Sequence, residues 1–187
     1  MTLPLFLMAG ALMAQQPYDI LLKGGHLLDA KNKINARRDV AIKAGRVAAV
    51  AADIPVAQAR KVIDVTGCYV TPGLIDLHAH VFAGTDGGKL SGGNASIHPD
   101  DFALRTGVTT VVDAGSSGRH NFAVFKKTVI ERSRTRVLVF LNIGGVGMPG
   151  DAQEQNVPDM DAKAAGALAL ANKDTIVGIK VAHYRGP

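Results

Sequence analysis

The stretch VTPGLIDLHAH, residues 70–80, decides how this chain is interpreted. It enters on a Pro-Gly turn, continues as an apolar run and ends in two histidines one residue apart. Because side chains alternate between the two faces of a β-strand, we expect His78 and His80 on one face at the carboxyl end of a strand. Two imidazoles in that position can hold one metal ion. Asp76 shares the face by the same alternation and is a candidate for orienting a ligand.

Two histidines at this spacing also occur at solvated strand ends, so the H-x-H pattern by itself leaves both interpretations open. The strand is otherwise apolar, yet its polar residues Asp76, His78 and His80 gather on one face. A solvated strand end does not explain why these three polar residues share one face. Their common face therefore favours metal ligation.

After residue 70 the chain alternates between strands, loops and helices. The apolar patterns predict strands at 70–78, 108–113, 136–142 and 176–181. They predict helices at 99–106, 120–132 and 158–172. This order is typical of an α/β fold with a parallel sheet.

Three further polar residues stand at the ends of predicted strands. Lys180 ends the last strand, and alternation places it on one face with Ile176 and Gly178. Asp113 and Asn142 end the second and third strands. Strand ends are where barrel enzymes place their site residues, so all three are candidates. A solvated lysine, and turn formation by Asp113 and Asn142, are the alternatives that the sequence leaves open. His183 has the wrong parity for the face of Lys180 and is interpreted as a loop residue.

Residues 17–70 contain short apolar runs broken by Gly, Asp and Asn. We expect strands at 19–22, 26–28, 39–42 and 46–50, with a hairpin turn at 43–46. A single cysteine, Cys68, excludes an internal disulfide, and its β-like surroundings predict a buried side chain.

Residues 1–16 form an apolar stretch followed by Gln15 and Gln16. The apolar part is too short to span a bilayer and is typical of a secretory signal peptide, which predicts a periplasmic or secreted protein. No Lys or Arg precedes the apolar stretch, so a cytoplasmic protein with an apolar amino terminus is the alternative.

Charge and composition exclude little but argue against a nucleic-acid partner. The formal net charge is +5, yet most basic residues lie among acidic ones, and aromatic residues make up only 5% of the chain. The two densest basic groups, within 31–38 and 126–136, have no interleaved aromatic residues and are interpreted as solvated faces.

Four segments together resemble one family of enzymes. They are TPGLIDLHAH (71–80), GVTTVVDAGSSG (107–118), SRTRVLVFLNI (133–143) and IVGIK (176–180). In order and spacing they are similar to the amidohydrolase superfamily, and within it to the amidohydrolase/deacetylase branch related to dihydroorotases. The resemblance implies a (β/α)₈ barrel flanked by a small β-sandwich. It also implies two divalent metal ions, zinc being the expected metal. His78 and His80 would hold one of them, and a carboxylated Lys180 would bridge both.

Only four strands fit before residue 187, whereas a closed barrel has eight strands. The resemblance therefore predicts a partial β-sandwich over 17–70 and the amino-terminal half of a barrel over 71–187. The absent half would supply the aspartate that acts as general base. We expect the chain to work, if at all, as a homo-oligomer or with a complementing carboxyl-terminal chain.

For the intact enzyme the resemblance implies hydrolysis of amide or ester bonds of small molecules by a metal-activated water, as in a deacetylase. Two alternatives stay open. One is hydrolysis of cyclic amides of the dihydroorotase or hydantoinase kind, and the other is a truncated chain without catalytic activity.

Overall fold

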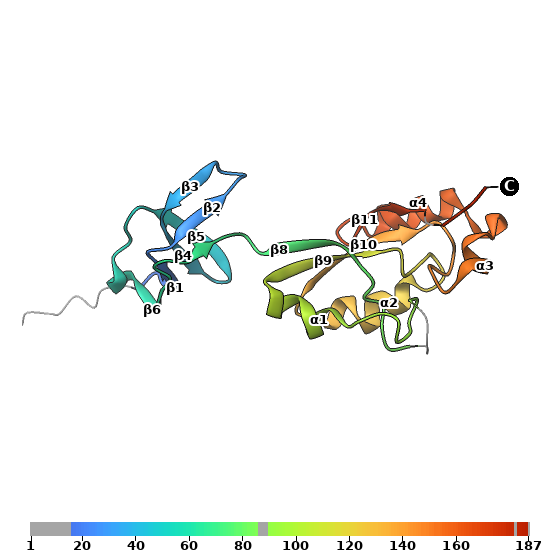
Figure 1. Ribbon diagram of the computed structural model, residues 1–187, viewed down its shortest axis with the longest axis horizontal. Helices are drawn as coiled ribbons and strands as arrows, with labels where there is room; N and C mark the ends of the chain where they lie inside the picture. Colours follow the sequence, from blue (N-terminus) through green and yellow to red (C-terminus); the bar gives the residue numbers. More distant parts are fainter. Residues whose placement is uncertain (1–15, 86–89, 182, 187) are drawn as a thin grey trace, which may run out of the picture. The chain divides into compact units, whose positions relative to one another are not determined.

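The computed structural model describes residues 16–85, 90–181 and 183–186, and it divides into two compact units between Pro72 and Gly73 (Figure 1). The predicted signal peptide falls on residues 1–15, with Gln16 at its end, and so lies outside the described part of the chain. Across the described ranges no helix is long and apolar enough to cross a lipid bilayer.

The first unit is built from two small sheets. The four-stranded sheet has the order β5-β4-β1-β6 and consists of β1 (Tyr18–Lys23), β4 (Asp39–Lys43), β5 (Arg46–Ala51) and β6 (Ala59–Asp64). The three-stranded sheet has the order β3-β2-β7 and consists of β2 (His26–Asp29), β3 (Ile34–Arg37) and β7 (Tyr69–Val70). Both sheets are mixed, because β6 pairs parallel with β1 and β7 parallel with β2. A short 3-10 helix, η1 (Val56–Gln58), precedes β6.

The hairpin between β4 and β5 confirms the predicted turn. Ala44 and Gly45 both have positive φ, 49° and 71°. Two successive residues with positive φ are what a tight hairpin needs to match the twist of its strands. The prediction for Cys68 was wrong: its side chain is exposed, because the residue lies in the turn between β6 and β7 and not within a strand.

A buried carboxylate, Asp39, organises the first unit. Its side chain is 2% exposed and accepts hydrogen bonds from the backbone N–H groups of Gly24 and Ile54, both at 2.8 Å. Lys23 Nζ lies 2.6 Å from the same carboxylate and 2.5 Å from Asp53. Burial raises the pKa of Asp39, but the hydrogen bonds from Lys23, Gly24 and Ile54 outweigh it and lower the pKa below its ordinary value.

We predict that Asp39→Asn destabilises the first unit by about 1.5–3 kcal/mol, because bonds to a buried charge are lost. Since folding lowers this pKa, its contribution is complete above the ordinary carboxyl pKa and is lost as the pH falls through the lowered value. Amide hydrogen exchange in β1 and β4 measures both effects.

The matched control is Asp53→Asn, which removes the other carboxylate of Lys23. Asp53 is 80% exposed, so we expect exchange in β1 and β4 to stay close to that of the parent chain. An equal effect of the two substitutions would contradict the role given to Asp39.

The second unit is an α/β structure around one parallel sheet with the order β11-β10-β9-β8. Its strands are β8 (Leu74–Ala79), β9 (Val108–Ala114), β10 (Arg136–Asn142) and β11 (Ile176–Lys180). Its helices are α1 (Pro99–Phe102), η2 (Ala103–Thr106), α2 (Phe122–Thr128), η3 (Ile130–Arg132), α3 (Asp151–Glu154), η4 (Val157–Asp159) and α4 (Ala162–Ala171).

The predicted elements of this unit are confirmed, with shifts at their ends. The strands after β8 agree within a residue, whereas β8 begins later than predicted, at Leu74. The last helix also begins later, at Ala162, because the carboxylate of Asp161 accepts the backbone N–H of Ala164 and caps the helix there.

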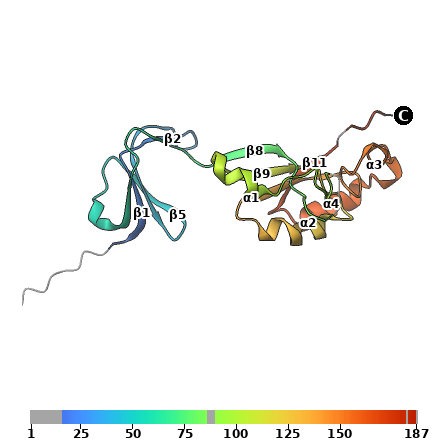
Figure 2. The ribbon, with the colours of Figure 1, turned by 60° about the horizontal axis from the view of Figure 1, so that its bottom comes forward.

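Helices α2 and α4 lie on one side of the parallel sheet (Figure 2). Phe122 and Phe125 of α2 and Ala165 of α4 pack against Val111, Val137, Val139 and Leu141 of the central strands. The ring of Phe125 also stacks on that of Phe82, with centroids 4.6 Å apart. This packed core fixes the central strands, and with them the ends that carry the candidate site.

The two outer strands differ from the central ones. β8 pairs only with β9, and β11 only with β10, within the described part of this unit. Their large apolar side chains are exposed, namely those of Leu74, Ile75, Leu77, Val177 and Ile179. The parallel sheet therefore has two open apolar edges.

Candidate metal centre

His78 and His80 lie together at the carboxyl end of β8. Their ring centroids are 5.5 Å apart, with an angle of 73° between the ring planes. Ala79, between them, is buried in the hydrophobic core that the sheet forms with α2 and α4. The two imidazoles therefore project from the side of the strand opposite the core, as alternation predicts.

The ring of His80 is held by partial burial and by a polar contact. It is half-buried, and its Nδ1 lies 2.9 Å from the hydroxyl oxygen of Ser116. Burial lowers the pKa of His80, and the positive charges of His78 and Lys180 lower it further. A lowered pKa favours the neutral imidazole, which is the form that binds a metal ion.

Asp113 is paired with Ala79 across β8 and β9 and is fully buried. Its two carboxylate oxygens accept the backbone N–H groups of Val81, at 2.8 Å, and Ser116, at 2.7 Å. Burial raises the pKa of Asp113, and these hydrogen bonds act in the opposite direction. Asp113 thus joins the loop that follows β8 to the loop that follows β9.

Asp76 contacts the main chain of the site. Its Oδ1 accepts the backbone N–H of His78 at 3.0 Å, and the pairing of β8 with β9 shifts between Asp76 and Ala79. Asp76 therefore steadies the irregular end of β8 through the backbone, without a hydrogen bond to either imidazole ring among those formed by the described residues.

Lys180 ends β11, but the predicted face was wrong in one respect. The register of β10 and β11 shifts between Val139 and Phe140, so a β-bulge interrupts the alternation. Ile176 consequently lies in the buried core, whereas a Cβ atom on Gly178 would meet the ring of Phe140, on the other face. Lys180 keeps the face of Gly178 and is paired with Asn142.

Gly115 makes room for the stem of Lys180. A Cβ atom at this position would lie 2.7 Å from Cγ of Lys180 and 3.2 Å from Nδ2 of Asn142, and the residue has a φ of 95°. Asn142 braces the same loops, since its amide donates to the Gly115 carbonyl at 3.2 Å and accepts the Gly144 N–H at 2.9 Å. Asn142 therefore acts on the loop backbone in this structure.

Two residues near the site were not foreseen as a pair. Glu154, at the end of α3, is only 8% exposed, and both of its carboxylate oxygens lie close to Nδ1 of His183, at 3.0 and 3.1 Å. The charges of both groups act on the pKa of His80, Glu154 raising it and His183 lowering it. His183 is a loop residue, as predicted, whereas Glu154 stands in a polar segment whose sequence carries no signal of burial.

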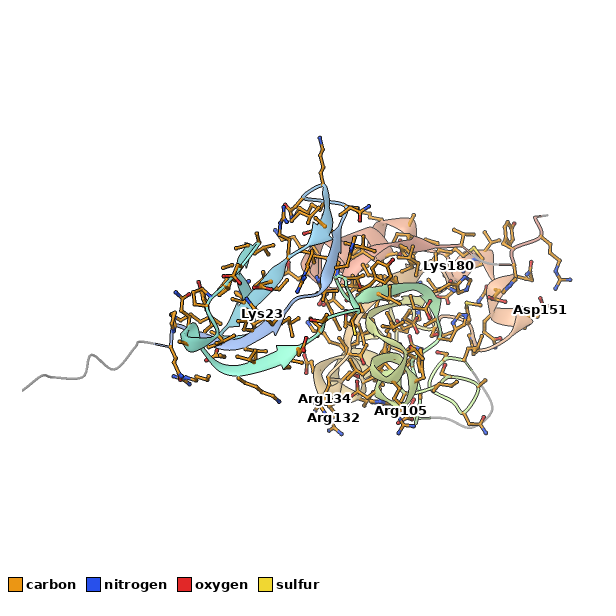
Figure 3. The ribbon with its side chains drawn as sticks, turned by 60° about the vertical axis from the view of Figure 1, so that its left-hand side comes forward. Lys23, Arg105, Arg132, Arg134, Asp151 and Lys180 are labelled. Atoms are coloured by element: carbon orange, nitrogen blue, oxygen red, sulfur yellow. The ribbon has the colours of Figure 1, made fainter. Side chains whose placement is uncertain are left out.

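Basic side chains lie at both ends of the strands of the parallel sheet. Lys180 lies at the carboxyl end of its strand, whereas Arg105 and Arg134 precede β9 and β10 (Figure 3). The clustered basic residues of the second unit thus include groups at the amino ends of the strands, away from the histidine pair.

The side chains present fit part of a metal site. Two imidazoles side by side suit one divalent ion. Lys180 would be a ligand only if its amine were converted to a carbamate, which is an anionic oxygen donor. Among the residues that the structure describes, no three His, Cys, Asp or Glu side chains come together to hold a metal ion. The described ligand set is therefore incomplete without a modified Lys180 or ligands from elsewhere.

Comparison with known proteins supplies the wider context. No family model matches the chain. The chain is 35% identical to a deacetylase of Agrobacterium fabrum over 140 residues, which is 73% of this chain and 33% of that protein. The solved structure of an adenine deaminase is similar to this chain, with a TM-score of 0.71 and 29% identity. The match covers 87% of this chain and 40% of the deaminase chain. The solved structure of a dihydroorotase is also similar, with a TM-score of 0.68 and 30% identity. That match covers 86% of this chain and 41% of the dihydroorotase chain.

The parallel sheet with histidines at a strand end defines the class of protein as an α/β protein with a candidate metal centre. The comparisons then place the chain in the amidohydrolase superfamily. The chain spans between a third and two fifths of the length of these relatives.

We predict that Gly115→Ala lowers the free energy of unfolding of the second unit by more than about 1 kcal/mol, because an alanine is strained at this φ and its Cβ collides with Lys180. Urea unfolding followed by circular dichroism measures the change. The matched control is Gly166→Ala, within α4, where a Cβ atom meets nothing within 4 Å. We expect that substitution to stabilise the chain by about 0.5–1 kcal/mol, as helix propensity dictates. Equal behaviour of the two variants would contradict the close contact.

Proposed function

We propose that this chain is part of a metal-dependent hydrolase that cleaves amide or ester bonds of small molecules, with removal of acyl groups as its reaction. The observation that carries the proposal is the pair of imidazoles at the end of β8, whose ring centroids lie 5.5 Å apart. The similarity to a deacetylase supports the acyl substrate class.

His78 and His80 would hold one divalent metal ion, for which zinc is the proposed identity. Lys180 would react with carbon dioxide: its neutral amine would attack the carbon, a nitrogen–carbon bond would form as one carbon–oxygen double bond opens, and one proton would leave. The resulting carbamate would offer anionic oxygen donors to the metal site. When bound, such ions lower the pKa of a water and polarise a carbonyl group.

The protein's own part in this chemistry is to position the ligands. Asp76 accepts the backbone N–H of His78, and Asp113 accepts that of Val81, the residue after His80. The two carboxylates thus hold the backbone that carries the histidine pair. Gly115 leaves the space in which the stem of Lys180 lies. Of the Glu154–His183 pair, Glu154 raises the pKa of His80 and His183 lowers it.

The second unit is proposed to be half of a (β/α)₈ barrel, and the first unit part of a β-sandwich. The open apolar edges at β8 and β11 support this, because further parallel strands would bury them. The remaining strands, the other metal ligands and the aspartate that serves as general base would come from additional chain, which the relatives have.

A second candidate reaction is hydrolysis of a cyclic amide. The structural match to a dihydroorotase, at 30% identity, favours it. The same ligands and the same activated water would serve both reactions, and the residues that contact the substrate would decide between them.

We predict that the purified chain takes up zinc and that the double variant His78→Ala/His80→Ala loses it, because both imidazoles of the site are gone. Lys180→Ala is expected to lower the zinc content as well, since the bridging carbamate cannot form. Metal content per chain, measured by plasma mass spectrometry after gel filtration, gives the result.

His26→Ala is the control, because His26 lies in the first unit and its Nε2 is bonded to Asn35 at 2.6 Å. Zinc content should be unchanged in this variant. A chain that is folded by circular dichroism but binds no zinc, or that keeps its zinc in the double variant, would overturn the assignment of the site.

A further inference from the structure

The first unit contains a surface cavity that the proposed function does not use. Its volume is about 380 Å³, and its walls include Gly24, His26, Arg37 and Tyr69 together with the turn 66–68. All of these residues belong to the first unit, so the cavity lies wholly within one compact part of the chain. The volume falls within the range of small-molecule sites, about 300–1,000 Å³.

Three of these side chains form a row across the three-stranded sheet β3-β2-β7. His26 in β2 is paired with Arg37 in β3 on one side and with Tyr69 in β7 on the other. Residues that are paired in register project from the same face of a sheet, so a guanidinium, an imidazole and a phenol ring lie next to one another. The rings of His26 and Tyr69 are in edge contact, with centroids 5.3 Å apart. The row therefore offers a cation at one end and an aromatic surface at the other.

The guanidinium of Arg37 has unused donors. Among the residues that the structure describes, this side chain takes part in no hydrogen bond and no ion pair. The carboxylate of Asp64 accepts the backbone N–H of Thr66 at 2.9 Å, and hydrogen bonds from Thr66 together with the charge of Arg37 lower its pKa. Arg37 thus acts on Asp64 through its charge, while its N–H groups stay available for a ligand.

Gly24 keeps the space in front of Arg37 open. A Cβ atom on this residue would lie 2.6 Å from Oγ1 of Thr66 and 3.3 Å from Nη2 of Arg37. Gly24 also has a φ of 81°, a backbone conformation that favours glycine. The space between the Thr66 hydroxyl and the guanidinium is therefore free of a side chain.

We propose that this cavity binds a small organic anion, with its carboxylate or phosphate group on Arg37 and a flat apolar part against Tyr69. A guanidinium presents parallel N–H groups that match the oxygens of such an anion. Tyr69 is 71% exposed, so a ligand that covers its ring removes apolar surface from water. The proposal concerns the first unit and does not rest on the proposed function.

The direct test is a titration of the ¹⁵N-labelled full chain with benzoate, followed by amide chemical shifts. Benzamide is the matched control ligand, because it has nearly the same shape but no charge. We expect benzoate to shift the amide signals of Gly24, Arg37 and residues 66–69 in a saturable way, and benzamide to leave them in place. Equal shifts with both ligands, or no saturable shift with either benzoate or phenyl phosphate, would overturn the proposal without any variant having to fold.

Substitutions of Arg37 test its part in binding. Arg37→Gln should weaken the binding of benzoate about 10-fold or more, because hydrogen bonds to a charged group are lost. Arg37→Lys keeps the charge but not the paired donors, and we expect an affinity between those of the parent chain and Arg37→Gln. Arg46→Gln is the matched control, because Arg46 is exposed in β5 and does not line the cavity, and its loss changes the net charge equally. Equal weakening by Arg37→Gln and Arg46→Gln would contradict the site.

Two further comparisons identify the parts of the ligand. Tyr69→Ala should weaken the binding of benzoate about 2- to 10-fold, the range expected for an aromatic contact, and unchanged binding would overturn the role of the ring. Phenyl phosphate that binds more tightly than benzoate would assign the anionic group as a phosphate, and weaker binding would assign it as a carboxylate. Either result supports the site.

Discussion

The buried carboxylate of Asp113 is the constraint on which the candidate site depends. It accepts one backbone N–H after β8 and one after β9, so it ties the ends of two neighbouring parallel strands together. A carboxylate without solvent access is costly unless donors surround it, and here both oxygens have a donor. The folded chain therefore satisfies Asp113 only when the loops that carry His80 and Ser116 lie side by side.

A second constraint sets the position of Lys180. The β-bulge between β10 and β11 turns the end of β11, so that Ile176 packs in the core while Lys180 lies beside Asn142. Gly115 then has to lack a side chain, because the lysine stem occupies that space. The ends of β9, β10 and β11 therefore depend on one another through Gly115, Asn142 and Lys180.

The sequence predicted the parallel strands, the α/β class and the projection of His78 and His80 from one side of β8, because periodicity and strand-end polarity are local properties. It could not predict the bulge that moves Ile176 away from the face of Lys180, since a register shift depends on the partner strand. The roles of Asp113 and Asn142 in holding loop backbone, and the burial of Glu154 against His183, likewise arise from contacts between distant segments.

The central claim is that His78 and His80 together bind one metal ion. X-ray absorption spectroscopy at the zinc edge of the loaded chain tests it most directly, because imidazole rings scatter in a characteristic way beyond the first shell. The account predicts nitrogen and oxygen neighbours near 2.0–2.1 Å with outer-shell scattering from two imidazoles. A first shell of oxygen alone, or the same two-imidazole signal in a chain lacking both histidines, would contradict it.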